Sequence, residues 1–294
     1  MKRDEYAAFF ERLGHRVVRT RSAAWYDARG GIFMSLPHAA PLEPDPAELR
    51  EIFRGHAWGV RFPAPADGPG RLSYALVLDD AQYDLHSLSA NSRSKVRRGL
   101  KWWDVRRIDS DHVRKRGEQA NAETLARVAL QYELCGWDQW WDAVAATESA
   151  EVWAALDGST LGAYLVVVIV DGVAELLIAR SRDDARARYA NHALVFTAAR
   201  EYMNRADVGA LFFGLESLEP EGGVDQFKTS LGFMRRRLRQ RIVFHPAAER
   251  VADIRLVRAA IGTAARWWPQ RETLRKLDGL LAFHAAQKEM SCAS

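Results

Sequence analysis

The sequence between residues 162 and 179 reads GAYLVVVIVDGVAELLIA, two apolar runs joined by Asp171 and Gly172. An Asp-Gly pair between β-branched runs predicts a two-residue hairpin turn. The first run is apolar at every position, which is typical of a strand that is buried on both faces of a sheet. Helices must cover such a sheet, so this stretch favours a mixed α/β fold.

Further elements follow the hairpin toward the C-terminus. Apolar residues at helical spacing predict a helix over 192–205, and the run at 211–215 predicts another buried strand. A strand at 242–244 then precedes a helical tail over 247–288, with an interruption at Pro269. The second half of the chain therefore alternates strands with helices, as an α/β fold requires.

The residues before the hairpin show the same mixture of elements. Helical spacing indicates helices over 5–16, 46–53, 120–134 and 137–155, and the run at 72–78 predicts a strand. A helix capped by Ser89 or Asn91 follows this strand, and Gly99 with the following pair Trp102 and Trp103 marks its weakening end. We expect a second α/β region in this half.

Composition limits the classes of protein to consider. The chain has 294 residues, 48% of them hydrophobic, which is ample for a packed core. It begins with charged residues, and its longest apolar run, 161–170, is about half of what a bilayer crossing needs. Cys135 and Cys292 are the only cysteines, so neither a disulfide framework nor a zinc site is expected. We expect a cytoplasmic protein without integral membrane contact, a metal or a tightly bound cofactor.

Positive charge is concentrated in two places. Seven basic residues lie between Arg93 and Arg107, and five more lie between Arg235 and Arg241. Two basic zones suggest a polyanionic ligand, which could be a phosphate-bearing cofactor, a nucleotide-linked substrate or RNA. Solvated surfaces without a ligand are the alternative.

Three segments resemble a known family. They are LSANSRSKVRR at 88–98, LFFG at 211–214 and GGVDQFKTSLGF at 222–233. In this order, and flanked by these strands, they resemble the Fem-type peptidoglycan bridge aminoacyltransferases, a branch of the GNAT superfamily. The resemblance covers roughly residues 83–245. It implies an α/β, mixed-sheet GNAT-like fold and transfer of an activated acyl group onto an amine on a small molecule or peptide.

The resemblance also implies a domain arrangement. The order helix, strand, strand, helix, strand recurs loosely in the two halves, which suits two tandem GNAT-like halves. We expect an N-terminal half at 1–110, a C-terminal transferase half at 111–246 and a helical tail at 247–294.

One segment departs from the acyl-CoA branch of the superfamily. Acetyl-CoA-dependent GNAT proteins hold the pyrophosphate in a glycine-containing loop before a helix. The corresponding residues here, 186–192, read RARYANH and contain no glycine. Arg186 and Arg188 can still bind phosphate. The co-substrate is therefore either aminoacyl-tRNA, as in Fem-like transferases, or acyl-CoA.

Several residues are candidates for the chemistry, the first of them from the resemblance. Lys228 matches the family's Phe-Lys lysine and would stabilise the oxyanion of the tetrahedral intermediate, with Phe227 lining the acyl pocket. Glu216 and Asp225 are the nearest carboxylates in sequence for a general base or for substrate binding, and Tyr189 is a candidate acid. The ordinary alternatives are a surface lysine, a core phenylalanine and a packed turn tyrosine.

Other residues are candidates for substrate binding. Arg93 and Arg97 share a helix face and could meet a substrate phosphate, and Trp137 could wall the acceptor pocket or stack on a base. A solvated face and core packing are the respective alternatives. From a different functional class, the chain could instead be a non-catalytic RNA- or nucleotide-binding module that keeps the same fold.

Overall fold

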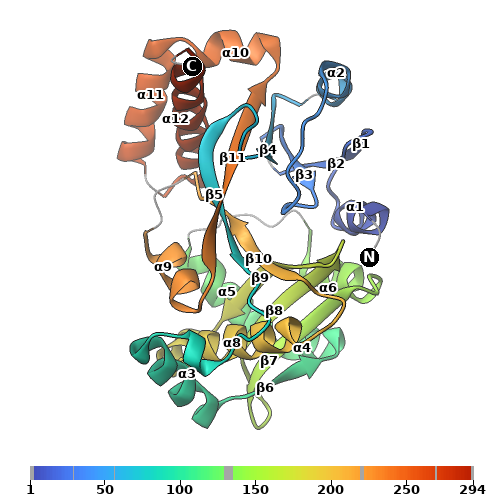
Figure 1. Ribbon diagram of the computed structural model, residues 1–294, viewed down its shortest axis with the longest axis vertical. Coiled ribbons are helices and arrows are strands. Elements are labelled where there is room, and N and C mark those ends of the chain that lie inside the picture. Colours follow the sequence, from blue (N-terminus) through green and yellow to red (C-terminus); the bar gives the residue numbers. More distant parts are fainter. Residues whose placement is uncertain are drawn as a thin grey trace. The chain divides into compact units, whose positions relative to one another are not determined.

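The computed structural model describes residues 3–28, 30–55, 57–128, 135–218, 222–268 and 270–292 (Figure 1). The chain forms two compact units, each assembled from separate segments. Unit 1 comprises Met1–Glu5, Leu76–Gly214 and Gly222–Arg235, and unit 2 comprises Tyr6–Ala75, Leu215–Glu221 and Arg236–Ser294. The boundaries expected at residues 110 and 246 follow a different division and stay predictions.

A mixed sheet forms the centre of unit 1. Its strands are β6 (Asp104–Ile108), β7 (Ala150–Asp157), β8 (Thr160–Val170), β9 (Val173–Ser181) and β10 (Ala210–Leu215). β6 to β9 are antiparallel neighbours, whereas β10 returns parallel to β9. The end of β5 (Arg71–Leu78) lies beside β10. The mixed α/β class expected from the sequence is confirmed.

The Asp-Gly hairpin forms as expected. Asp171 and Gly172 have φ angles of 51° and 75°, the left-handed region that a tight hairpin turn requires. β8 is buried at every position after its first residue. Such burial needs a layer of helices on each face of the sheet.

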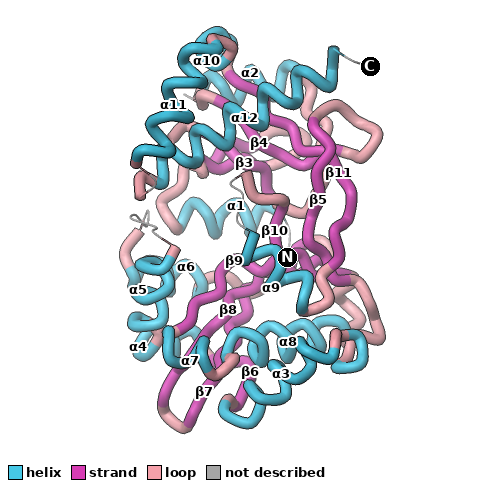
Figure 2. Tube along the Cα trace, turned by 90° about the vertical axis from the view of Figure 1, so that its left-hand side faces the viewer, coloured by secondary structure: helices cyan, strands magenta, loops and turns pink. Residues whose placement is uncertain are grey.

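Helices cover both faces of this sheet (Figure 2). Trp153 of β7 packs against Tyr202 of α8 (Ala190–Met203), on the same face as α3 (Ala90–Trp102). Tyr164 of β8 packs against Trp141 of α6 (Trp137–Ala145). Trp153 pairs with Leu165, the neighbour of Tyr164, so the two aromatic side chains point to opposite faces. α4 (Ser110–Arg116) and α5 (Glu118–Arg127) accompany α6.

One predicted helix is wrong over part of its length. The helix expected over 137–155 ends at Ala145, and residues 150–155 belong to β7. β7 pairs with β6 on one side and β8 on the other, and both of its faces are buried. A strand of this kind is apolar at successive positions, so its sequence lacks the alternation that would separate it from a helix. Of the helix expected over 120–134, residues 129–134 lie outside the described residues.

Unit 2 contains a second sheet segment with a related order. β1 (Val17–Arg19), β2 (Ala24–Asp27) and β3 (Ile32–Leu36) form an antiparallel meander after α1 (Arg3–Arg12). α2 (Pro46–Arg54) then leads to β4 (Gly59–Ala64), which is parallel to β3. β11 (Met234–Phe244) pairs antiparallel with β4, and β5 follows it.

The two units repeat one pattern. Each has an antiparallel meander, then a helix, then a strand parallel to the last strand of the meander. In unit 2 that helix begins where Asp45 and Glu48 form a capping box and Pro46 occupies the first turn. The repeated order agrees with the tandem arrangement expected from the sequence.

The C-terminal segment is helical, as predicted. It consists of α10 (Pro246–Ala252), α11 (Arg255–Trp267) and α12 (Glu272–Cys292), while Pro269 lies outside the described residues. Leu280, Leu281 and Phe283 of α12 pack against Ile242 and Phe244 of β11. Within the described residues, no helix has both the length and the apolar character needed to cross a membrane.

α3 ends within the expected tryptophan pair, at Trp102 with Trp103 as its C-cap. Gly99 also has a packing role that the sequence does not show. A Cβ at this position would lie 2.7 Å from the carbonyl oxygen of Tyr189 and 3.0 Å from Cβ of Ala193. The glycine therefore allows α3 to approach the start of α8 closely.

We expect Gly99→Ala to destabilise the protein. The new methyl group would meet backbone atoms, so α3 and α8 would have to separate, at a cost of about 1–3 kcal/mol of unfolding free energy. Gly223→Ala is the matched control, because nothing lies within 4 Å of a Cβ there. Urea denaturation of both variants measures the difference, and equal midpoints would contradict the close approach.

Candidate functional site

β9 and β10 are paired over only three positions. Residues 210–212 of β10 lie opposite residues 173–175 of β9. Beyond Glu175, β9 keeps its pairing with β8 as far as Ser181, whereas β10 runs on to Leu215 with no further partner in β9. The two parallel strands therefore part, and β9 presents an open edge from Leu176 onward on the side of β10.

The open edge is also accessible. Residues 176–180 of β9 are partly exposed, although the neighbouring strand β8 is buried. The register between β8 and β9 shifts between Val166 and Val167, so Leu177 is an extra residue in β9. Bulges of this kind bend a strand and are common beside binding sites. We use the word slot for this partly exposed edge of β9 together with the unpaired end of β10.

Hydrogen bonds from α5 hold the far end of β9 in place. The hydroxyl of Thr124 accepts from N–H of Ser181 (2.9 Å) and donates to the carbonyl oxygen of the same residue (3.1 Å). The guanidinium of Arg180 donates to Oδ1 of Asn121 (2.9 Å). The two Thr124 bonds satisfy the backbone of Ser181 in the way a neighbouring strand would, and the Arg180 bond adds a side-chain contact.

Lys228 lies at the β10 side of the slot. It is on α9 (Gly222–Ser230), and its Nζ donates to the carbonyl oxygen of Phe213 over 2.8 Å. The same ammonium group is 4.9 Å from the centre of the Phe213 ring, within cation–π range. Phe213 follows the last residue of β10 that pairs with β9. The ammonium group is therefore held where the two strands begin to part.

Phe227 belongs to an aromatic row that connects α9 with α8. Its ring meets His192 edge to face, with centroids 5.1 Å apart, and His192 meets Tyr189 in the same way at 5.6 Å. Burial, together with the positive charge of Lys95, lowers the pKa of His192 to about 4. The imidazole is consequently neutral at physiological pH and can exchange hydrogen bonds without carrying a charge.

His192 is a residue that sequence reasoning left out of the candidate site. It lies in the first turn of α8, three positions after Tyr189, so both side chains come to the same side of the helix start. That spacing is visible in the sequence. The contact with Phe227 is not, because it joins residues of two different helices.

The loop before α8 is held by its own hydrogen bonds. Residues Asp183–Ala187 form the short helix α7, and the N–H groups of Arg186, Arg188 and Tyr189 all donate to carbonyl groups within this loop. Tyr189 takes a left-handed conformation with φ of 61°. These three amides are therefore engaged and do not form a cradle for a pyrophosphate.

The two arginines of this loop are placed differently. Arg188 forms an ion pair with Asp157 (3.3 Å) and stacks on Trp103 at 4.6 Å, while its carbonyl oxygen accepts from the Trp103 indole. It is thus part of the packing between the loop and the end of α3. Arg186 is exposed. A phosphate role for either residue stays a prediction.

Arg93 and Arg97 lie on the solvent side of α3. With Arg98 and Lys101 they line a surface groove of about 540 Å³. Neither Arg93 nor Arg97 pairs with a carboxylate in the described part of the chain. The groove is therefore a one-sign surface, the arrangement that attracts polyanions.

Trp137 lies away from the slot, whereas Asp225 is on the same helix as Lys228. Trp137 packs on Trp141 and Tyr164, and its indole N–H donates to the carbonyl oxygen of Arg114 (2.9 Å), on the face of the sheet opposite α8. Asp225 is on α9, one turn before Lys228.

Glu216 belongs to unit 2, where it enters a polar network. Its carboxylate accepts from the hydroxyl of Ser73 (2.6 Å), and its carbonyl oxygen accepts from Arg61 (2.9 Å) and Gln240 (3.3 Å). Burial lowers the pKa of Arg61 to about 10, so this guanidinium remains charged at neutral pH. The predicted roles of Trp137, Asp225 and Glu216 stay predictions.

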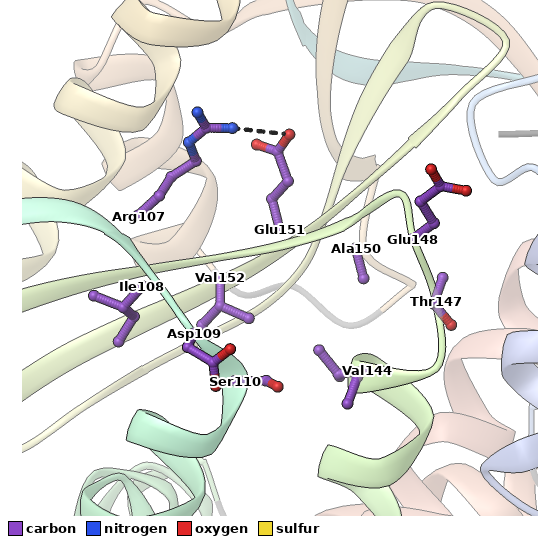
Figure 3. A pocket seen from close by; sticks show the side chains of 11 residues that line it. Arg107, Ile108, Asp109, Ser110, Val144, Thr147, Glu148, Ala150, Glu151 and Val152 are labelled. Carbon is purple, nitrogen blue, oxygen red and sulfur yellow. Dashed lines mark ion pairs between the residues drawn. The ribbon is translucent and has the colours of Figure 1, made fainter.

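A second hollow lies elsewhere in unit 1, near the start of β7 (Figure 3). Glu151 lines it and forms an ion pair with Arg107 (3.2 Å), and it also accepts from Tyr202 (2.8 Å) and Arg205 (2.6 Å). Tyr202 is ten residues after His192 on α8, about 15 Å along the helix axis. The carboxylate of Glu151 is held by these three partners, so we assign it a structural role and not a catalytic one.

Comparison with solved structures shows which fold this is. The C-terminal domain of a protein assigned as a lysylphosphatidylglycerol synthetase from Agrobacterium fabrum has a TM-score of 0.57 at 14% identity, over 88% of this chain and 91% of that one. FemX has a TM-score of 0.55 at 11% identity, over 83% and 91%. L-PGS from Bacillus licheniformis has a TM-score of 0.54 at 14% identity, over 82% and 91%.

The chain has a Fem-like GNAT fold. The resemblance drawn from its motifs is thereby confirmed at the level of the fold. No protein-family model matches the sequence, and no curated protein matches it. The loop before α8 contains the short helix α7 and no glycine.

The neutral state of His192 leads to a prediction about pH. The folded protein holds this side chain neutral down to about pH 4, whereas the unfolded chain takes up a proton near its ordinary pKa of about 6.5. The unfolding free energy should therefore fall as the pH drops through this window. His192→Gln should show a smaller fall, as measured by urea denaturation between about pH 7.5 and about pH 5.

The difference between variant and wild type is the informative quantity. His112 and His284 also have a pKa lowered by burial, and they contribute to the same fall in both proteins. An identical pH dependence in the variant would show that His192 is not held neutral by its surroundings.

Proposed function

We propose that the chain is an N-acyltransferase that moves an activated acyl or aminoacyl group onto an amine. The observation that carries the proposal is the parting of β9 and β10, with an ammonium group fixed at the point of separation. Such a slot fits an extended donor arm, which can pair with the open edge of β9 as an added strand. The carbonyl carbon of the acyl group would then lie near Lys228.

Lys228 would act on the charge that develops during transfer. Attack of an amine on an ester or thioester gives a tetrahedral oxyanion, and a fixed positive group stabilises this charge more than the neutral carbonyl. An ammonium group carries three donors, so the hydrogen bond to Phe213 does not prevent a further one to the oxyanion. Phe227 would form part of the wall for the acyl group.

The proton from the attacking amine must also be removed. Neutral His192 contacts Phe227 and Tyr189 and can accept a hydrogen bond from a water or an amine. Asp225 and Glu216 remain candidates for the general base, and Tyr189 remains the candidate acid for the leaving group. Its hydroxyl would return a proton to the departing oxygen or sulfur.

Two observations favour aminoacyl-tRNA over acyl-CoA as the donor. Amides that would cradle a pyrophosphate before α8 are engaged inside the loop. α3 offers instead a basic groove that follows the helix from Arg93 to Lys101, which suits a long phosphate backbone. We propose that the transfer takes place in the cytoplasm, where aminoacyl-tRNA is available. The acceptor would be an amine on a small molecule or peptide.

Replacing Lys228 tests the proposal. We expect Lys228→Met to lower kcat/KM for acyl transfer by about 100- to 1000-fold, the usual loss when an oxyanion donor is removed. The assay follows label from radiolabelled aminoacyl-tRNA or acetyl-CoA to a panel of amines. Lys115→Met is the matched control, because this exposed lysine lies on α4.

The outcomes of this assay bear on the role of Lys228, on the function and on the donor. If Lys228→Met transfers as fast as wild type, the lysine has no part in the chemistry. If neither donor is consumed by the wild type although RNA is bound, the chain is the non-catalytic RNA-binding module instead. Consumption of acetyl-CoA alone would show that the closed loop before α8 does not exclude coenzyme A.

The basic groove of α3 makes a separate prediction. Arg93→Gln combined with Arg97→Gln should weaken binding of tRNA and reduce the slope of log affinity against log salt by roughly 1.5, the share of two phosphate contacts. Arg50→Gln with Arg54→Gln is the control, because these arginines have the same spacing on α2. Filter binding at several salt concentrations gives both slopes. Unchanged slopes would show that the groove does not contact RNA.

A further inference from the structure

Helix α11 of unit 2 has two apolar faces. Its inner face is formed by Ile261 and Ala265, and Ile261 packs in the cluster of Ile242, Leu280 and Phe283. A cluster of this kind accounts for one face of an amphipathic helix. The second apolar face needs a separate explanation.

The outer face of α11 is apolar and exposed. Leu256 is 81% exposed and Trp267 is 74% exposed. With Ala260 they follow the spacing of one helix face, which also carries Thr263, whose hydroxyl accepts from Arg266 (3.3 Å), and Trp268 is exposed just after the helix. The preceding segment adds Val251 and Ile254, both about half exposed. Exposed apolar side chains gathered in this way mark an interaction surface.

The surroundings of this face are positive. Residues 254–271 contain no aspartate or glutamate and four arginines: Arg255, Arg266 and Arg271, together with Arg258, which has the spacing of the inner face. Arg255 and Arg266 each precede a residue of the apolar stripe, which places them about 100° around the helix from it. In the described part of the chain none of the four arginines forms an ion pair with a carboxylate.

The nearby acidic groups are already engaged on the other side. Glu249 and Asp253 of α10 pair with Lys288 of α12, at 3.1 Å and 2.7 Å. Asp278 of α12 lies against Gly262 of α11, where a Cβ would be 3.1 Å from its carboxylate. Gly262 is next to Ile261 on the inner side. Among the described residues, no carboxylate therefore pairs with the arginines that flank the outer stripe.

We propose that the outer face of α11 lies in the interface of an anionic lipid membrane. Leucine and tryptophan on one side with arginine beside them is the composition of helices that lie flat at the headgroup level. Tryptophan favours that level because its ring is apolar and its N–H is polar. Positive charge next to the stripe complements anionic headgroups. A groove on another protein could bury the apolar stripe. It would not explain why residues 254–271 contain arginines but no aspartate or glutamate.

The proposal does not depend on the acyl transfer proposed above. It concerns helices α10 and α11 of unit 2, and it predicts peripheral attachment, in which the helix lies along the surface. Vesicle binding by α11 can therefore be present or absent whatever the slot of unit 1 does.

Vesicle sedimentation of the full chain tests the proposal. The wild type should bind vesicles in which about one lipid in three is phosphatidylglycerol and should bind pure phosphatidylcholine at least about tenfold more weakly. Leu256→Glu should lower binding to the anionic vesicles by about thirtyfold or more, since it removes apolar area and adds a negative charge. Arg255→Gln with Arg266→Gln should lower it by about 25-fold, about fivefold for each charge.

Met234→Glu is the matched control. Met234 is 62% exposed and is followed by arginines, but it begins strand β11 instead of lying on a helix stripe. It should bind like the wild type, while circular dichroism confirms that all variants are folded. Equal binding to both vesicle types, or undiminished binding by Leu256→Glu, overturns the proposal. The proposal is also overturned if the wild type is a dimer and the Leu256→Glu variant is a monomer, because a second copy of the chain would then cover this face.

Discussion

The site depends on the unequal pairing of one strand. β9 is bonded to β8 along its whole length but to β10 at three positions only. A central strand of a sheet normally has a partner on each side, because unpaired backbone groups are costly to bury. Here the hydrogen bonds of Thr124 to Ser181 satisfy the far end of β9, and the part between stays open to an incoming group.

Other features keep the strands in this arrangement. The hydrogen bonds of Thr124 to Ser181 tie α5 to the far end of β9, and the absence of a side chain at Gly99 lets α3 rest on the start of α8. The hydrogen bond of Lys228 to Phe213 ties α9 to the end of β10. Each wall of the slot is thus held by a helix behind it, and such support from regular elements is what a precise site needs.

The sequence allowed accurate prediction where the signal is local. The hairpin at Asp171 and Gly172 follows from turn chemistry between two residues, and the start of α3 follows from the Ser89 cap. β7 was predicted as helix because a strand buried on both faces lacks alternation, and β1 to β4 carry signals too short to read alone. Of the candidate site, Phe227, Lys228 and Tyr189 lie on elements that meet, yet the contact of His192 with Phe227 depends on two helices packing together. Such long-range contacts leave no pattern in a single sequence.

The route of the chain through its two units has a consequence for synthesis. β4 pairs with β11, and the paired residues Ala64 and Arg239 are far apart in the sequence. At 5–20 residues per second, the ribosome delivers the second strand on the order of 10 to 35 s after the first. During that time β4 has an unpaired edge, which is a template for wrong association with other chains. We therefore expect the nascent protein to need protection of this edge, for example by a chaperone, until β11 has been synthesised.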